Sequence, residues 1–175
     1  MMRFIRIFSF FKSDCDKVEH IRLGRTVEST VFEVVALAII IATWILAIWM
    51  YRHAPESIPT HFDLQGNPNN EGSRLVILIM AGVSTILTAL LMACAYVPTY
   101  VVNPPSKLEN FRQYVLASRM VRIIALLMAL LFMSVIFMMC YPESPVPKYL
   151  LISLTVLNVV VAIVFAIMIK MARTR

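Results

Sequence analysis

The feature that most constrains this fold is a set of four long apolar stretches, which cover about residues 31–50, 75–96, 121–141 and 149–169. A helix needs about 20 apolar residues to cross a hydrocarbon core roughly 30 Å thick. Unpaired backbone groups are not tolerated in lipid, so only helices or closed barrels span it. We therefore predict an all-α integral membrane protein with four transmembrane helices, its membrane domain covering residues 31–171.

Composition agrees with this prediction. The chain is 60% hydrophobic and 15% charged, whereas about a quarter of the residues in soluble domains are charged. Little chain is left outside the bilayer: an amino-terminal arm (1–30), two longer connections (51–74 and 97–120) and a tail (172–175). The basic and aromatic start of the arm has two readings, an interfacial helix on an anionic leaflet or a frayed tail.

The distribution of basic residues predicts the orientation. Of the 16 Lys and Arg residues, six lie before the first apolar stretch, four in the middle connection or at the very start of the third stretch, and three after the fourth. The other two connections hold three. Basic residues near spans stay on the cytoplasmic side, so we expect both termini in the cytoplasm of a bacterial inner membrane and 51–74 outside. Because the basic residues lie in short clusters beside the spans, we expect no nucleic-acid partner.

Three local patterns predict where helices begin. Thr30 and Glu33 have capping-box spacing at the first span, and Ser73 precedes the second as a cap. Ser106 and Glu109 repeat the capping-box spacing after two prolines. A third helix that continued from Ser106 would be about 50 Å long, so its first turns would project into the cytoplasm.

The connection 51–74 has the most distinctive sequence. Ile58, Thr60 and Phe62 alternate with Pro59, His61 and Asp63, and a Gly-Asn-Pro-Asn-Asn run follows at 66–70. Alternation followed by turn-forming residues predicts a short loop or a small hairpin at the outer ends of the helices.

This segment resembles a bacterial membrane domain of unknown function that also forms the amino-terminal part of SdpI-type immunity proteins. The similarity rests on the spacing within IPTHFDLQGNPNNEGSR, at Pro59, His61, Phe62, Asp63, Gly66 and Pro68. A second block is similar to the family's stretch after its second span, at Asn103, Pro104, Glu109, Asn110, Gln113, Tyr114 and Arg119. Together the resemblance covers about residues 35–125. It implies toxin immunity or envelope signalling, although SdpI-type proteins have six spans and this chain has four.

The candidate chemistry is sparse. Two histidines and one aspartate of the outer segment, His53, His61 and Asp63, are the weak candidates for a metal site, but their spacing matches no established ligand motif. Phosphate-binding glycine loops and the usual hydrolase and metalloprotease motifs are missing from the sequence. We therefore expect neither catalysis nor a cofactor.

Asn158, near the middle of the fourth span, is the deepest strongly polar residue. Its two readings are interhelical packing and the lining of a substrate path.

Three functions remain open from the sequence. The first is an accessory or interaction protein, with an extracytoplasmic peptide or membrane partner at the outer loop and anionic lipids at the basic inner helix. The second is a small transporter or permease subunit, which at this size would act as a homo-oligomer. The third is a metal-binding enzyme of the outer loop.

Overall fold

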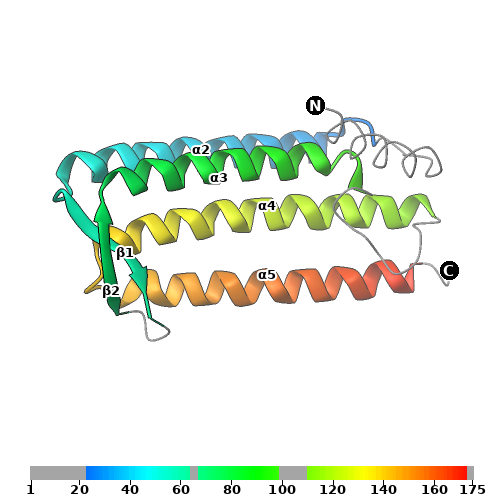
Figure 1. Cartoon of the computed structure of the whole chain (residues 1–175). Helices are drawn as coiled ribbons and strands as arrows, with labels where there is room; N and C mark the ends of the chain where they lie inside the picture. Colours follow the sequence, from blue (N-terminus) through cyan, green and yellow to red (C-terminus); the bar gives the residue numbers. More distant parts are fainter. Residues whose placement is uncertain (1–22, 64–66, 99–109, 173–175) are drawn as a thin grey trace, which may run out of the picture.

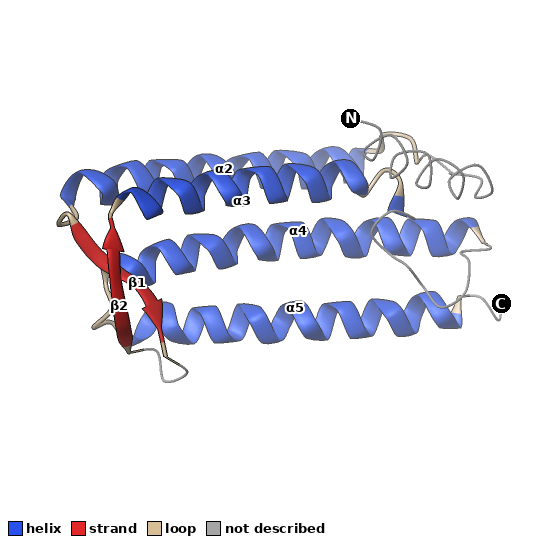
Figure 2. Ribbon diagram, viewed as in Figure 1, coloured by secondary structure: helices blue, strands red, loops and turns tan. Residues whose placement is uncertain are grey.

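The described part of the chain folds into four long helices capped at one end by a two-stranded hairpin (Figures 1 and 2). The computed structural model describes residues 23–63, 67–98 and 110–172. In chain order the elements are α2 (Val27–His53), β1 (Ser57–Phe62), β2 (Pro68–Ser73), α3 (Leu75–Cys94), α4 (Phe111–Cys140) and α5 (Pro145–Met171). All four helices are long and apolar enough to cross a membrane. The prediction of an all-α membrane fold with a small hairpin between the first two spans is confirmed.

The packing within the bundle is that of a membrane protein. Most helix residues with no exposed surface are small, among them Ala47, Ala81, Ala117, Ala125 and Ala129, whereas Ile77 and Ile136 are large. Many other large side chains, such as Ile45, Ile86 and Val156, are more than half exposed. Small residues let helix backbones approach closely in lipid, where no hydrophobic effect drives the helices together. The exposed large side chains therefore face the hydrocarbon.

The helices are arranged as a three-helix group with α5 at its side. α2, α3 and α4 pack against one another, whereas α5 packs on α4 (Figure 1). A partly buried hydrogen bond links α2 to α3, from Trp44 Nε1 to Thr85 Oγ1 at 2.9 Å. Thr85 in turn donates to the Ala81 carbonyl at 2.9 Å. The Thr85 hydroxyl thus serves interhelical packing.

The first helix begins earlier than predicted. Thr26 is its N-cap, and a capping box forms with Ser29: Ser29 N donates to Thr26 Oγ1 at 3.1 Å, and Thr26 N donates to Ser29 Oγ at 2.8 Å. The predicted box of Thr30 and Glu33 was wrong. Both pairs have suitable spacing, but the Glu33 carboxylate is engaged by residues distant in sequence, as described below.

Three other boundaries also differ from the sequence expectation. α4 begins at Phe111, because its N-cap Asn110 has an extended backbone; a helix continuous from Ser106 was therefore wrong. Arg74 is the N-cap of α3, while Ser73 Oγ accepts a hydrogen bond from Leu75 N at 3.3 Å. α5 begins at Pro145, four residues before the predicted start, since proline is tolerated in a first helical turn.

The hairpin lies across the ends of the helices, over the end of α4 (Figure 1). β1 and β2 are antiparallel, with Ser57 opposite Ser73 and Phe62 opposite Pro68, and the register is interrupted around His61. Asp63 closes the turn, since its carboxylate accepts from Asn67 N at 2.7 Å. We call this end of the bundle the hairpin end, and the opposite end, with the starts of α2 and α4, the basic end.

Candidate functional site

The hairpin is fixed to the bundle by a buried isoleucine and an arginine. Ile58 is 2% exposed and packs in an apolar cluster with Met50, Ile77 and Ile136. The Arg74 guanidinium donates to the Ala54 carbonyl at 3.3 Å and lies 5.1 Å from the centroid of the Tyr51 ring. Arg74 N also donates to the Glu56 carbonyl at 3.1 Å. The outer segment is thus a docked element of defined orientation.

A cavity of about 350 Å³ lies beside this docked hairpin. Three parts of the chain form its walls: the last turn of α2, the start of β1, and the end of α4 with the connection to α5. The walls are mainly apolar and aromatic, and the lining includes Trp49, His53, Ile58, Pro59, Met139 and Tyr141. Ligand sites usually have this make-up, an apolar concave surface with few polar groups.

The predicted outer-loop residues are distributed between this cavity and the solvent. Pro59 lines the cavity, and Phe62 packs against the apolar cluster around Ile58. His61 and Pro68 are exposed, and Asp63 serves the turn. Gly66 lies outside the described residues.

The weak metal candidates are each engaged locally. His53 Nδ1 is 2.7 Å from the Trp49 carbonyl oxygen, and the centroids of the His53 and Trp49 rings are 4.7 Å apart. His61 Nδ1 lies 3.3 Å from Thr60 Oγ1. Within residues 23–63, 67–98 and 110–172, no three His, Cys, Asp or Glu side chains gather into a metal-binding group. A metalloenzyme of the outer loop therefore gains no support from the geometry.

The inner motif joins α4 to two neighbours at the basic end. Gln113 Nε2 donates to the Ile169 carbonyl at 3.0 Å, and Gln113 Oε1 accepts from Asn110 N at 3.1 Å. Tyr114 is buried in a cluster with Ile169. Arg119 pairs with Glu28 of α2 at 2.7 Å. These residues therefore hold the helices together.

The remaining inner-motif residues, Asn103, Pro104 and Glu109, lie outside the described part of the chain, as does the amino-terminal segment 1–22. The intramembrane Asn158 donates from Nδ2 to the Leu154 carbonyl of its own helix at 3.1 Å. Its Oδ1 atom is buried without a hydrogen bond.

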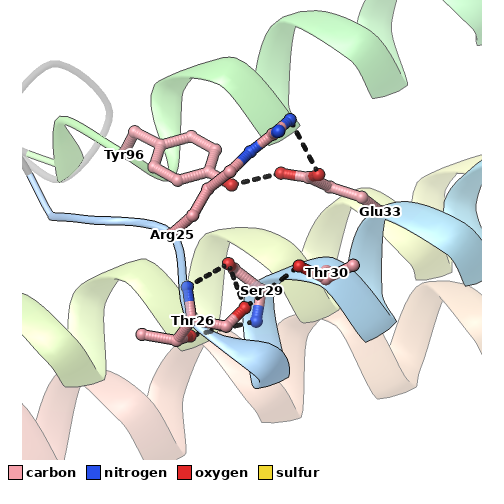
Figure 3. Close-up of polar contacts among 6 residues, drawn as sticks. All are labelled: Arg25, Thr26, Ser29, Thr30, Glu33 and Tyr96. Atoms are coloured by element: carbon pink, nitrogen blue, oxygen red, sulfur yellow. Dashed lines mark hydrogen bonds and ion pairs between the residues drawn. The ribbon is translucent and has the colours of Figure 1, made fainter.

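A polar cluster that sequence reasoning missed closes the basic end (Figure 3). The Tyr96 hydroxyl, just after α3, donates to the Glu33 carboxylate of α2. Arg25 pairs with the same carboxylate at 3.3 Å. The Tyr96 hydroxyl and then the Glu33 charge raise the pKa of the Arg25 guanidinium, which stays protonated. No local pattern predicts contacts between residues so far apart in sequence.

The fold and the hairpin-end cavity together define a class: a four-helix membrane protein with an apolar recess beside a docked hairpin. Residues 38–85, which run from α2 through the hairpin into α3, match the family described as "Domain of unknown function (DUF1648)". An uncharacterized protein from Archaeoglobus fulgidus is 37% identical over 49 residues, which are 28% of this chain and 27% of that protein. The chain thus matches about a quarter of the length of this curated relative. No solved structure matches.

The family match covers all of the cavity wall that runs from the end of α2 to β1. It includes Trp49, His53, Ile58 and Pro59, whereas Met139 and Tyr141 lie outside it. The matched segment therefore carries both the hairpin and more than half of the residues that line the recess.

Proposed function

We propose that this chain is a membrane interaction protein whose hairpin end binds an apolar segment of an extracytoplasmic peptide or of a neighbouring envelope protein. The observation that supports the proposal is the cavity of about 350 Å³ walled by the α2 end, β1 and the α4 end. Trp49 and Tyr141 give it two aromatic walls, and aromatic residues are enriched where proteins bind one another. Toxin immunity or envelope signalling in the manner of SdpI-type proteins is one physiological form of this activity.

The location of the occupant follows from the proposed orientation. The excess of Lys and Arg in the arm, the middle connection and the tail favours a cytoplasmic basic end in a bacterial inner membrane. The hairpin end then faces the cell envelope, where secreted peptides and the outer parts of membrane proteins meet it.

Thiol labelling tests this orientation. In a chain whose cysteines are replaced by serine, we expect His61→Cys, at an exposed position of β1, to react with a membrane-impermeant maleimide in intact cells. The matched control is Arg112→Cys, exposed at the basic end, which should react only after permeabilisation. The reverse pattern would place the hairpin in the cytoplasm and remove an envelope peptide from the proposal.

Photocrosslinking tests the recess itself. A photoreactive phenylalanine analogue replaces Tyr141, which lines the cavity, and as a control replaces Tyr149, which is 69% exposed on α5 and outside the cavity lining. We expect position 141 to give a discrete protein or peptide adduct that position 149 does not give. Filling the cavity with Ala54→Phe should abolish that adduct while the chain still inserts in the membrane.

The phenotype of a deletion strain complements the crosslinking result. A deletion strain should become sensitive to a secreted peptide or to envelope stress, and Ala54→Phe should fail to complement it. Identical adducts at positions 141 and 149, or full complementation by Ala54→Phe, would show that the recess is not a binding site.

A further inference from the structure

The basic end contains a second cavity, of about 210 Å³, between the start of α2 and the first turns of α4. Its lining includes Arg25, Arg119 and Arg122, and one carboxylate, Glu28. Two of these arginines have carboxylate partners, since Arg25 pairs with Glu33 and Arg119 with Glu28. The three arginines therefore have two carboxylate partners between them, and one arginine is left without an ion pair among the described residues.

Arg122 is that third cation, and it is buried. Arg122 is only 5% exposed, and its guanidinium carbon lies 5.2 Å from the centroid of the Tyr96 ring. Its Nε atom is buried and has no hydrogen-bond partner in the part of the chain that the structure describes. A guanidinium stays charged in proteins, and a buried cation without a counter-charge costs several kcal/mol. The π face of Tyr96 offsets a part of that cost.

A hydroxyl lies beside this guanidinium on the same helix face. Ser118 is 1% exposed, precedes Arg122 by one helical turn and lines the same cavity. Its Oγ atom is also buried and finds no hydrogen-bond partner within residues 23–63, 67–98 and 110–172. A guanidinium and a hydroxyl together present several donors, which suits an oxyanion with several acceptor oxygens. A water occupies about 30 Å³, so the cavity has room for a phosphate group and ordered water.

The depth of Arg122 in the bundle indicates where such an anion comes from. The helix from Arg122 to the end of α4 at Cys140 rises by about 27 Å. This is close to the roughly 30 Å thickness of the hydrocarbon core. With the hairpin end of α4 at one boundary of the core, Arg122 lies near the opposite boundary, next to the headgroup region that holds the lipid phosphates.

We propose that Ser118 and Arg122 bind a phosphate oxyanion, and that a phospholipid headgroup supplies it. The single uncompensated positive charge matches the single negative charge of a phosphodiester. Arg25 and Arg119 also line the cavity, and Glu33 and Glu28 balance their charges. The lipid then stabilises the junction of α2 and α4, because it neutralises a cation that both helices enclose. This inference is independent of the recess at the hairpin end and of the orientation of the chain.

The test uses the delipidated full chain in detergent and native mass spectrometry. Phosphatidylglycerol is the probe, diacylglycerol with the same acyl chains is the phosphate-free control, and inorganic phosphate is a competitor. We expect wild type to bind phosphatidylglycerol in preference to diacylglycerol. Arg122→Gln should weaken that binding about tenfold or more, as expected for a lost charge-assisted contact. Arg112→Gln removes an exposed charge of the same helix outside this cavity and should leave binding within about twofold.

A second variant separates loss of the site from loss of the fold. Ser118→Glu places a carboxylate one turn from Arg122, so it should abolish lipid binding while the melting temperature equals or exceeds that of delipidated wild type. If inorganic phosphate binds at Arg122 and the lipid does not, the oxyanion site stands and its ligand is soluble. Binding of phosphatidylglycerol that is equal in wild type, Arg122→Gln and Ser118→Glu would overturn the proposal.

Discussion

Replacing Ile58 with alanine should release the hairpin from the bundle. Ile58 is 2% exposed and is the buried residue of β1 that enters the cluster formed by α2, α3 and α4. Truncation of a buried isoleucine costs about 2–5 kcal/mol. A two-stranded hairpin is at best marginally stable on its own in water, so a loss of this size is enough to free it. The recess at the hairpin end then loses one wall.

Amide hydrogen exchange measures this release. The amides paired between β1 and β2, together with Arg74 N, should lose protection in Ile58→Ala while the central turns of α3 and α4 keep theirs. The matched control is His61→Ala, on the exposed side of the same strand, which should change the free energy of unfolding by less than about 0.5 kcal/mol. Equal protection in Ile58→Ala and wild type would mean that Arg74 and the helix ends hold the hairpin without the isoleucine.

Gln113→Leu should detach the end of α5 from α4. Gln113 is 2% exposed. Its side-chain amide accepts a hydrogen bond from the Asn110 N–H and donates one to the Ile169 carbonyl. Leucine has a similar volume but no polar atoms, so both backbone groups lose a partner. The Ile169 carbonyl is buried, and a buried group left unsatisfied costs about 1–3 kcal/mol, whereas Asn110 is exposed. We expect a loss of about 1–3 kcal/mol in the free energy of unfolding, measured in mixed detergent and SDS micelles.

The location of the damage tests the mechanism. In Gln113→Leu, exchange should rise in the last turns of α5 and the first turn of α4, with the hairpin end unchanged. Arg112→Leu, at the neighbouring exposed position, should leave the stability within about 0.5 kcal/mol of wild type. A Gln113→Leu chain as stable as wild type would show that solvent or lipid headgroups replace the two hydrogen bonds.

The sequence predicts the number of helices and the hairpin well, because both follow from short-range rules. Span length is set by the bilayer, and alternation followed by turn residues favours a hairpin. The helix starts were harder to predict. The sequence holds two capping patterns four residues apart, Thr26 with Ser29 and Thr30 with Glu33. The choice between them depends on Tyr96 and Arg25, because both bind the Glu33 carboxylate.

The candidate site was only half visible in the sequence. Pro59 and Phe62 stand out as motif residues, and both contribute to the hairpin end. The part that Trp49 and Tyr141 play in the recess could not be predicted, because aromatic residues are common at the ends of membrane spans whether or not a binding site is present. Their meeting in one recess depends on how the ends of α2 and α4 pack, which no spacing along the chain encodes. The isolation of Arg122 at the basic end is likewise a property of the folded bundle.

The lateral position of α5 has a consequence for biogenesis. α5 packs on α4, whereas α2, α3, the hairpin and α4 pack among themselves. Since a chain is made from its amino terminus, every surface around the recess is synthesised before α5 leaves the ribosome. α5 then docks laterally, as a lipid-facing helix, onto a partner already in place.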